Sequence, residues 1–208
     1  MKNQPEKPAL PSPKRPVQGR LFIISAPSGA GKTTLCRAIR DLFPDLRYSV
    51  SYTTRPPRTG EQEGQDYFFI SADEFKNNIR RNTWAEWAEV HDHFYGTSAE
   101  FIDRHLSQGH DILLDIDVSG ARQILARYPE SVTIFILPPT FETLKQRLIK
   151  RGTDSAQTIA RRLKNAEMEI AQKGLYKNII INDRLPDTIE ALAAIIKDKD
   201  RQTEGEQA

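Results

Sequence analysis

The sequence has very little cysteine: Cys36 is the single one in 208 residues, so the chain has no framework of disulfide bonds. It also has no apolar run near the roughly 18 to 20 residues that a membrane-spanning helix needs. The first twenty residues, MKNQPEKPALPSPKRPVQGR, lack the apolar stretch of a secretory signal. We therefore expect a protein of the reducing cytoplasm with no membrane partner.

Net charge is small as well, at +2. Residues 1–20 contribute +4, which leaves −2 for residues 21–208. A body that binds nucleic acid is usually basic as a whole, so this balance favours local anion sites and no nucleic-acid partner. The hydrophobic content of 38% is enough for one globular unit with a buried core. The oligomeric state stays open.

The two ends of the chain are polar. Residues 1–18 combine basic side chains with five prolines, and residues 199–208 contain no apolar run. Such compositions are typical of disordered tails, although a proline motif that binds a partner is an alternative for the first tail. The folded domain is then expected to span residues 19–198.

Apolar runs and helical patterns alternate along this domain. The predicted strands are Leu21–Ser25, Ile112–Ile116, Val132–Leu137 and Ile179–Ile181. The predicted helices are Thr33–Leu42, Val118–Arg127, Phe141–Lys150 and Thr188–Lys197. Three of the four strands are nearly unbroken apolar runs, which is typical of strands covered on both faces. The alternation predicts an α/β fold, with a parallel sheet flanked by helices.

The first predicted strand leads into SAPSGAGKTT, residues 25–34, and then into a helix. This order of strand, small-residue loop and helix is the context that a phosphate-binding loop requires, and a chance glycine-rich turn is the alternative. The backbone of such a loop faces its N–H groups toward a phosphate. Lys32 would reach the β and γ phosphates of ATP, and the Thr33 hydroxyl would bind Mg²⁺. The candidate ATP-binding residues of the loop are Ala26, Pro27, Ser28, Gly29, Ala30, Gly31, Lys32, Thr33 and Thr34.

One position of this loop departs from the usual pattern. Ala26 stands where the first glycine of the consensus is common. Its backbone must therefore avoid the conformations that only glycine adopts readily.

A second group of anion-binding side chains lies in SVSYTTRPPRTGEQEGQDYFF, residues 49–69. Arg55 and Arg58 flank two prolines, which stiffen the loop so that two guanidinium groups can converge on one ligand. Paired guanidinium groups beside hydroxyl side chains suit a second phosphate. A solvated arginine loop is the alternative.

A carboxylate between two tryptophans marks the segment WAEWAEVHDHFYGTS, residues 84–98, which is predicted to form a strand and a turn. Glu86 could accept two hydrogen bonds from the N1–H and 2-amino donors of guanine. Adenine has an acceptor at N1, so it would leave the carboxylate unpaired. The alternative is that Glu86 is a surface residue and the tryptophans belong to the core.

Taken together, these motifs resemble guanylate kinase. The resemblance rests on VSYTTRPPR (50–58), GQDYFF (64–69), EWA (86–88), YGT (95–97) and LDID (114–117), in addition to the loop at 25–34. It runs in order from about residue 19 to residue 197. It implies a core of residues 19–50 and 98–198, a GMP-binding subdomain of residues 51–97, and a helical lid over about residues 147–172.

The resemblance also implies ATP-dependent phosphorylation of GMP, and of dGMP, with Mg²⁺ as the cofactor. The reaction would yield GDP for guanine nucleotide synthesis and GMP recycling. The implied GMP-binding residues are Ser51, Arg55, Arg58, Tyr67, Glu86, Tyr95, Thr97 and Asp117. Of these, the arginines and tyrosines would hold the phosphate, and Ser51, Glu86 and Thr97 would read the guanine.

Asp115 and Asp117 end a buried strand beside the phosphate-binding loop, where an acid is unfavourable unless it meets a cation or a donor. Asp115 is the candidate for the water shell of Mg²⁺, and Asp117 for a contact with the acceptor nucleotide. Their roles could be exchanged. Asp117 could equally cap the helix that begins at Val118.

Several arginines lie in LKQRLIKRGTDSAQTIARRLKNA, residues 144–166, which resembles the family's lid. Gly152 is predicted to end one helix, and Asp154 or Ser155 to begin the next. Arg147, Arg151 and Arg162 are the candidates for closing on the ATP phosphates, the last two as catalytic residues with Lys32 and Asp115. Asn182 is a further candidate for the ATP site. A solvated basic face is the alternative for some of the arginines.

Two features are interpreted as structural. His91 and His93 have strand spacing but no third ligand near them, so surface histidines are favoured over a zinc site. Cys36 lies within the predicted helix after the loop and is interpreted as a small buried apolar residue. Two other functions remain open: a non-enzymatic module of similar fold that binds a phosphopeptide, and a kinase for another monophosphate. The retained Gly31, Lys32 and Thr33 argue against the first.

Overall fold

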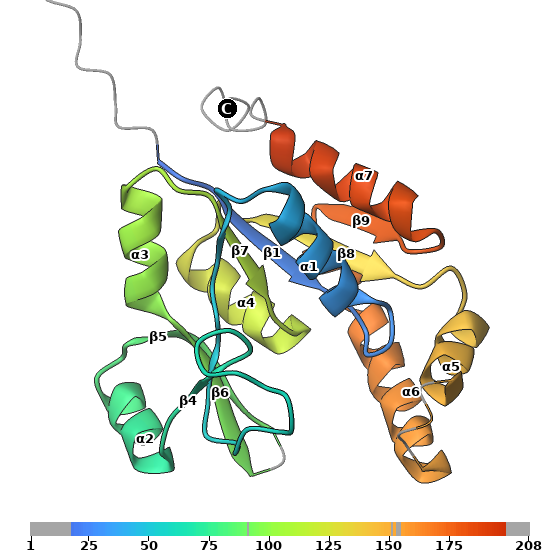
Figure 1. Ribbon diagram of the computed structural model, residues 1–208, viewed down its shortest axis with the longest axis horizontal. Coiled ribbons are helices and arrows are strands. Elements are labelled where there is room, and N and C mark those ends of the chain that lie inside the picture. Colours follow the sequence, from blue (N-terminus) through green and yellow to red (C-terminus); the bar gives the residue numbers. More distant parts are fainter. Residues whose placement is uncertain (1–17, 91, 151, 153–154, 199–208) are drawn as a thin grey trace, which may run out of the picture.

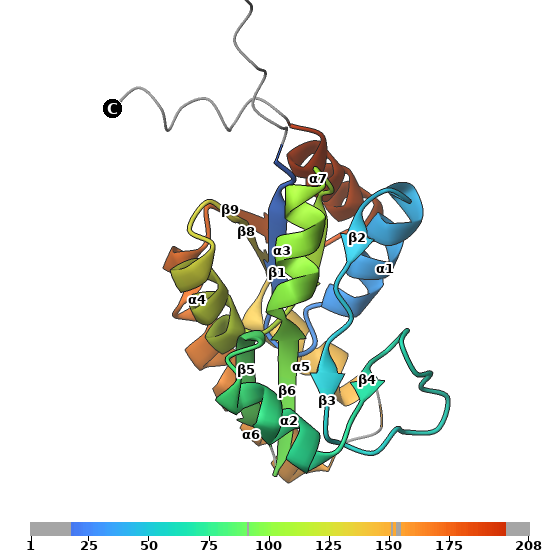
Figure 2. The ribbon, with the colours of Figure 1, turned by 90° about the vertical axis from the view of Figure 1, so that its left-hand side faces the viewer.

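The computed structural model describes residues 18–90, 92–150, 152 and 155–198, which form a five-stranded core sheet, a smaller four-stranded sheet and flanking helices (Figures 1 and 2). The core sheet has the order β2-β7-β1-β8-β9 and all of its pairs are parallel. Its strands are β1 (Leu21–Ser25), β2 (Arg47–Tyr48), β7 (Ile112–Asp115), β8 (Val132–Leu137) and β9 (Asn178–Ile181). The predicted α/β architecture is confirmed.

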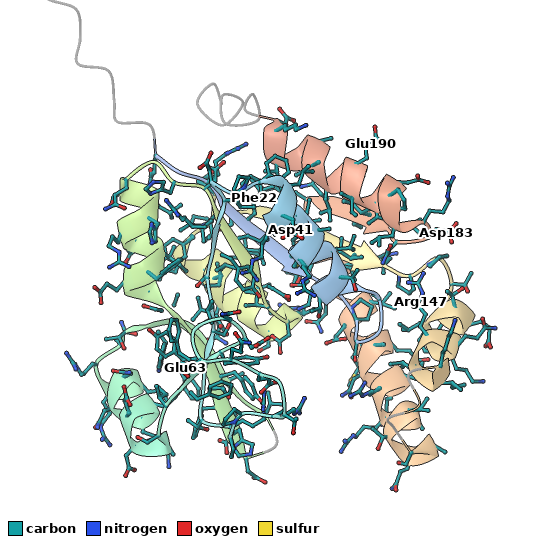
Figure 3. All side chains as sticks on the ribbon, viewed as in Figure 1. Phe22, Asp41, Glu63, Arg147, Asp183 and Glu190 are labelled. Carbon is teal, nitrogen blue, oxygen red and sulfur yellow. The ribbon has the colours of Figure 1, made fainter. Side chains whose placement is uncertain are left out.

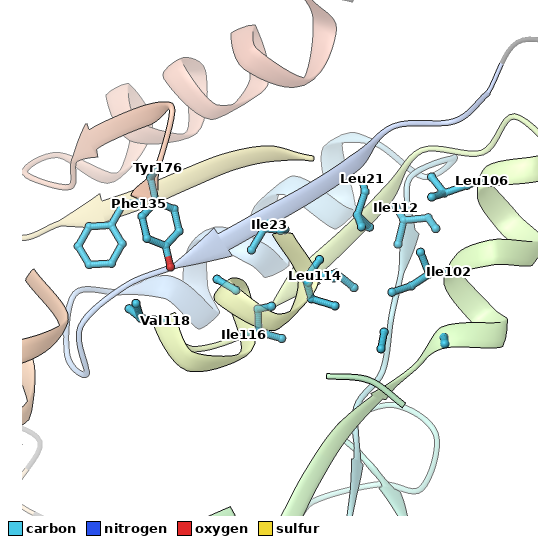
Figure 4. Close-up of a cluster of buried hydrophobic side chains, with 14 residues drawn as sticks. Leu21, Ile23, Ile102, Leu106, Ile112, Leu114, Ile116, Val118, Phe135 and Tyr176 are labelled. Carbon is cyan, nitrogen blue, oxygen red and sulfur yellow. The ribbon is translucent and has the colours of Figure 1, made fainter. Parts of the chain in front are cut away.

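Helices cover both faces of the core sheet because alternate residues of β1 point to opposite sides. Leu21 and Ile23 pack under α3 (Ala99–Ser107) and α4 (Val118–Arg127), the cluster drawn in Figure 4. Phe22 and Ile24 pack under α1 (Lys32–Leu42) and α7 (Leu185–Lys197). All five residues of β1 are buried, so the loop that follows it starts from the centre of the core.

The sequence predicted strands that are covered on both faces, and this prediction is wrong for β9. This strand lies at the edge of the sheet, and Ile179 and Ile181 are 48% and 58% exposed. The other boundaries differ by little. β7 ends at Asp115, one residue early, and α7 begins at Leu185, three residues before the predicted start, with Pro186 in its first turn.

The small sheet has the order β4-β3-β6-β5 and is formed by the sequence between β2 and α3. It comprises β3 (Tyr52–Thr53), β4 (Phe68–Phe69), β5 (Trp84–Val90) and β6 (His93–Ser98), with α2 (Ala72–Arg80) beside it. The ring of Phe75 from α2 stacks on Trp84 at 4.5 Å and on Phe94 at 5.3 Å. This aromatic stack gives the small sheet a core of its own.

Two helices follow β8 and stand apart from the small sheet: α5 (Phe141–Lys150) and α6 (Ala156–Ile170), which leads through the short helix η1 (Lys173–Leu175) to β9. The predicted cap of α6 is confirmed at Ser155, whose hydroxyl accepts a hydrogen bond from the Thr158 N–H, whereas Asp154 lies outside the described residues. Gly152 has a φ of 66°, which fits its predicted role in ending α5.

The first strand of the core is fastened to the last helix. Arg20 forms an ion pair with Asp111 at 2.6 Å and donates to the carbonyls of Ile196 and Asp198. A guanidinium with several acceptors around it is held in one orientation, so these contacts join the two ends of the described chain. Within the residues that the structure describes, no helix combines the length and apolarity required to cross a membrane.

Candidate active site

The loop between β1 and α1 has the backbone that a phosphate-binding loop requires. Gly29 and Gly31 adopt φ values of 97° and 98°, a region that side chains disfavour. Ala26 is absent from the described residues with positive φ, which confirms that alanine fits at this position. The loop ends where α1 begins, at Lys32, so the positive end of that helix faces the space in front of the loop.

The side-chain amide of Asn182, a buried residue directly after β9, supports this loop. Asn182 donates from Nδ2 to the Ala30 carbonyl at 2.7 Å and accepts from the Thr188 hydroxyl at 3.1 Å. Arg147 of α5 donates to the Asn182 carbonyl at 2.9 Å. A side chain at Gly31 would bring its Cβ within 2.5 Å of Asn182 Nδ2. The sequence indicated Asn182 as a contact for ATP, and the structure adds that it holds the loop in place.

A cavity of about 360 Å³ opens beside the loop. Its walls include Gly29, Gly31, Thr34, Arg147, Asn182 and Asp183. Figure 3 labels Arg147 and Asp183, which come from α5 and from the segment after β9 and lie on the same side of the loop. The position suits the part of a nucleotide that extends away from its phosphates.

Lys32 and Asp115 form an ion pair directly behind the loop. The Nζ of Lys32 lies 2.5 Å from Asp115 Oδ1 and 3.0 Å from the Ile116 carbonyl oxygen. Burial lowers the pKa of Lys32, but the charge and hydrogen bond of Asp115 outweigh it, so the net shift is upward. Lys32 is therefore a fixed positive charge, and the predicted neighbourhood of Lys32 and Asp115 is confirmed.

Asp117 caps α4. Its Oδ1 accepts a hydrogen bond from the Gly120 N–H at 2.7 Å, as the alternative interpretation of this residue predicted. Its other carboxylate oxygen is not used by the cap. A role toward a nucleotide therefore stays a prediction for Asp117.

Glu86 and Thr97 meet across β5 and β6. The two residues are paired in register, and the Thr97 hydroxyl donates to Glu86 Oε1 at 2.6 Å. Both are buried, and Oε2 of Glu86 lies so close to Gly120 that a Cβ there would be 2.9 Å away. Glu86 is therefore not a surface carboxylate, although Trp84 belongs to the core and Trp87 is partly exposed. Burial raises the pKa of Glu86 to about 7, the Thr97 hydrogen bond opposes the rise, and Asp117 adds to it.

This raised pKa predicts a pH-dependent stability for the ligand-free protein. Because the folded state binds the Glu86 proton more tightly than the unfolded state, the stabilisation is full below the ordinary value of 4.5 and is lost as pH rises through about 7. Relative to Glu86→Gln, the free energy of unfolding should fall by about 3 kcal/mol between pH 4.5 and 8. Urea titrations of both proteins across this range measure it. Glu89→Gln, at an exposed site on the same strand, is the control. Parallel pH curves for wild type and Glu86→Gln would contradict the prediction.

Arg55 lies in a cluster with Tyr67 and Tyr95. Its Nε donates to the Tyr95 hydroxyl at 3.2 Å, and its guanidinium carbon lies 5.4 Å from the centre of the Tyr67 ring. The two tyrosine rings meet edge to face at 5.9 Å. The structure thus brings together three of the four residues predicted to hold a phosphate.

Sequence reasoning missed Glu61. Its carboxylate binds Arg55 through both terminal nitrogens, at 2.8 and 3.0 Å, and accepts from the Arg58 N–H at 2.8 Å. Hydrogen bonding to Arg55 lowers the pKa of Glu61, and the Arg58 N–H adds to the effect. The available signal was an acid in the same proline-stiffened loop as two arginines. The Arg58 side chain itself is exposed, and Ser51 is half-buried.

The structure describes two of the three arginines that were predicted to close on the ATP phosphates. Arg147 donates to the Asn182 carbonyl, as described above, and at 3.5 Å to the Ala30 carbonyl of the loop. Arg162 lies half-buried on α6. Arg151 lies outside the described residues, as does His91. The described residues contain no group of three or more histidine, cysteine or acidic side chains that could hold a metal ion by itself. Cys36 is buried, as predicted, and burial raises its pKa, so its thiol stays neutral.

A cavity of about 1010 Å³ lies between the core and residues 64–67, which precede β4. Thr33 and Asp115 lie on its core wall, and Tyr67 with residues 64–66 lies on the opposite wall. One open space is therefore bordered by Thr33, next to the phosphate-binding loop, and by Tyr67, which belongs to the cluster around Arg55. Fold and site define a P-loop nucleotide-binding protein of the kinase type.

Comparison with known proteins identifies the family. The family model described as guanylate kinase matches residues 18–199. The chain is 52% identical to a guanylate kinase of Geobacter sulfurreducens over 179 residues, which cover 86% of this chain and 88% of the relative. It is 39% identical to a guanylate kinase of Thermotoga maritima over 181 residues, 87% of each chain. A crystal structure of guanylate kinase from Anaplasma phagocytophilum superposes with a TM-score of 0.69 at 30% identity, covering 86% of this chain and 85% of that one. The chain belongs to the guanylate kinase family of enzymes.

Proposed function

We propose that this enzyme transfers the γ-phosphoryl group of ATP to GMP, and also to dGMP, giving ADP and the corresponding diphosphate. The observation that carries the proposal is the buried pair of Glu86 and Thr97, in a protein whose core carries a phosphate-binding loop. Guanine offers two adjacent donors that suit the free oxygen of a carboxylate, whereas adenine would leave that buried oxygen unpaired. We expect dGMP to react because no residue can be assigned to the 2′-hydroxyl.

The second phosphate is assigned to the cluster around Arg55. The Tyr95 hydroxyl and the Tyr67 ring lie beside its guanidinium, and Arg58 extends from the same loop. Glu61 occupies two nitrogens of Arg55, so the GMP phosphate would approach from the side of the tyrosines. A planar guanidinium fixed by a carboxylate is a preorganised phosphate ligand.

The protein oxygens available at this site suit Mg²⁺, which does not need to be surrounded by protein ligands alone. Thr33 and Asp115 line the same cavity and supply hydroxyl and carboxylate oxygens. Mg²⁺ is usually held by one or two such ligands together with waters and substrate phosphates. When bound there, Mg²⁺ would neutralise charge on the donor phosphates. Thr33 would be a direct ligand and Asp115 would hold the water shell, with Asp117 toward GMP. The exchange of roles between the two aspartates remains the alternative.

In this proposal, phosphoryl transfer depends on holding the phosphates of both substrates in position. Lys32 and the loop N–H groups would hold the β and γ phosphates, and Arg147, Arg151 and Arg162 would close from the lid. The GMP phosphate is already an anion, so its attack needs no general base. Closure of residues 51–97 and of the lid over the loop would exclude water and limit futile hydrolysis of ATP. The product would serve guanine nucleotide synthesis and GMP recycling in the cytoplasm.

A coupled assay with ATP, Mg²⁺ and each of GMP, dGMP, AMP, UMP and dTMP tests this function. The expected result is turnover with GMP and dGMP and at most trace turnover with the others. Turnover that prefers another monophosphate would overturn the guanine assignment. If the folded protein turned over none of them, the fold would be serving as a binding module instead.

Arg58 provides a test of the phosphate assignment. Arg58→Lys keeps the charge but loses the planar pair of donors, so KM for GMP should rise at least about tenfold, on the order of 1.4 kcal/mol. KM for ATP should stay nearly unchanged, because the ATP phosphates lie on the other loop. Titrations of each substrate at saturating levels of the other measure both constants. Arg81→Lys, at an exposed site beyond α2, is the control. An unchanged KM for GMP would remove Arg58 from the phosphate site.

A further inference from the structure

Helix α4 of the core packs against β5, the edge strand of the small sheet (Figure 2). One side-chain amide makes two hydrogen bonds across this contact: Gln123 Nε2 donates to the Trp87 carbonyl at 3.0 Å, and Gln123 Oε1 accepts from the Trp87 N–H at 3.2 Å. The N–H and the carbonyl of one strand residue point to the same edge of the strand, so a single amide can satisfy both. Because β6 lies on the other edge of β5, Gln123 occupies the place where a further strand would pair.

The residues just before Trp87 also face the core. The pairing of β5 with β6 shifts register between Trp84 and Glu86, so Ala85 is passed over in the ladder. As a result Trp84, Ala85 and Glu86 are all buried, whereas strict alternation would turn Ala85 away from the side of its two neighbours. Ala85 lies in the same buried cluster as Ala121 of α4.

The Glu86 carboxylate fills a space that Gly120 of α4 leaves open. Thr97 holds Oε1 of this carboxylate at 2.6 Å. A Cβ at Gly120 would lie 2.9 Å from Oε2 and 3.2 Å from Cδ, and the first separation is one that real side chains avoid. Glycine is a weaker helix former than alanine, so the contact with Glu86 gives a reason for glycine at this helical position. Gly120 and Gln123 are three positions apart and therefore lie on the same face of α4.

We propose that α4 positions the carboxylate that reads guanine: Gln123 fixes β5 to the core, and Gly120 leaves the room in which Glu86 keeps one orientation. Both are positioning residues, because they act through Glu86 and not on the nucleotide itself. The observations that carry the proposal are the two hydrogen bonds to Trp87 and the close approach of Glu86 to Gly120. The inference rests on the proposed function, since it takes Glu86 as the residue that selects guanine.

Inosine monophosphate separates this role from a general contribution to stability. Its base has the N1–H of guanine but lacks the 2-amino group, so a well-placed carboxylate accepts one hydrogen bond fewer from it. Loss of the Glu86 orientation should therefore lower kcat/KM for GMP more than kcat/KM for inosine monophosphate. A generally weakened fold lowers both values by the same factor, which leaves their ratio unchanged.

The first variant is Gln123→Met, which keeps the length of the side chain but cannot make the two hydrogen bonds to Trp87. We expect KM for GMP to rise about tenfold, with kcat and KM for ATP within about twofold of wild type. The ratio of kcat/KM for GMP to that for inosine monophosphate should fall at least about fivefold. Gln108→Met, at an exposed glutamine at the end of α3, is the matched control and should equal wild type. If Gln123→Met fails to fold, Gln123→Glu, which keeps the acceptor and loses the donor, is held to the same criteria.

Gly120→Ala tests the second contact, because its added methyl group must displace the Glu86 carboxylate. We expect the same fall in the ratio, at least about fivefold, with an unchanged circular dichroism spectrum since alanine favours the helix. The control is Gly174→Ala, where a Cβ would meet no atom within 4 Å and the backbone has no positive φ. A wild-type ratio in folded Gln123→Met or folded Gly120→Ala would overturn the proposal. If Gly120→Ala fails to fold, the variants of Gln123 decide.

A double-mutant cycle tests whether Gln123 acts through Glu86. Added to Glu86→Gln, Gln123→Met should lower kcat/KM for GMP by less than about twofold further. A further loss of about tenfold would overturn the proposal. If Glu86→Gln alone kept the full preference for GMP, the proposed reading of guanine would be refuted instead, so the two failures are distinguishable.

Discussion

Lys32→Ala is expected to lower kcat by about a thousandfold, on the order of 4 kcal/mol of transition-state stabilisation. The reason is that Lys32 is a fixed positive charge behind the loop, placed by Asp115 and the Ile116 carbonyl where phosphate charge would be transferred. Steady-state assays with saturating ATP and GMP give kcat, and single-turnover measurements with enzyme in excess over GMP give the rate of the chemical step without a contribution from product release.

The same substitution removes the partner of Asp115, so folding must be checked separately. We expect a lower melting temperature but an intact circular dichroism spectrum, because Asp115 is close enough to the cavity to regain water. Lys145→Ala, at an exposed lysine of α5, should match wild type. A well-folded Lys32→Ala that keeps more than about a tenth of wild-type kcat would remove Lys32 from the chemistry.

Glu86→Gln should cause the largest loss of substrate selection. Glutamine keeps the shape but presents one acceptor and one donor, so its amide N–H₂ would oppose a donor of guanine. We expect kcat/KM for GMP to fall at least about a hundredfold, on the order of 3 kcal/mol. KM for ATP should hardly change, because Glu86 lies on the small sheet and not on the loop.

The matched control is Glu89→Gln, three residues along the same strand and exposed. It should leave kcat/KM for GMP at the wild-type level. The ratio of kcat/KM for GMP to that for AMP is the measurement that matters, because a general folding defect lowers both. A ratio that survives Glu86→Gln would show that guanine is selected elsewhere.

Much of the core could be predicted because its signals are local. The run Leu21–Ser25 is followed at once by the glycines and lysine of the loop, and the structure places β1 and α1 within a residue of the predicted bounds. The β9 run has the same apolar composition, yet two of its isoleucines are exposed. Its place at the edge of the sheet depends on the order of strands, which apolar composition does not encode.

The small sheet was harder to predict. Strands β3 and β4 have only two residues each, too short for an alternating pattern to be recognised. The aromatic residues that hold this sheet together come from five separate elements: β3, β4, α2, β5 and β6. The resemblance implied that Glu86 and Thr97 both read the guanine, whereas their register across β5 and β6 had no local signal.

In the candidate site, too, some residues could be predicted from the sequence and others could not. Residues with a distinctive chemistry, such as Lys32 and Arg55, stand out in the sequence. Glu61 and Asn182 act by supporting others, through contacts 6 and 152 positions away. A supporting role depends on which segments meet in space, so Glu61 was missed and Asn182 was indicated only as a contact for ATP, not as a support of the loop.

The contacts of Arg20 have a consequence for engineering. Since one guanidinium binds carbonyls of residues 196 and 198 from the start of β1, the two ends of the described chain adjoin. A domain whose ends adjoin can be inserted into a loop of a host protein, or relinked and opened elsewhere, without long spacers. Any such fusion should begin no later than residue 20 and end no earlier than residue 198, because a shorter piece loses the arginine or one of its acceptors.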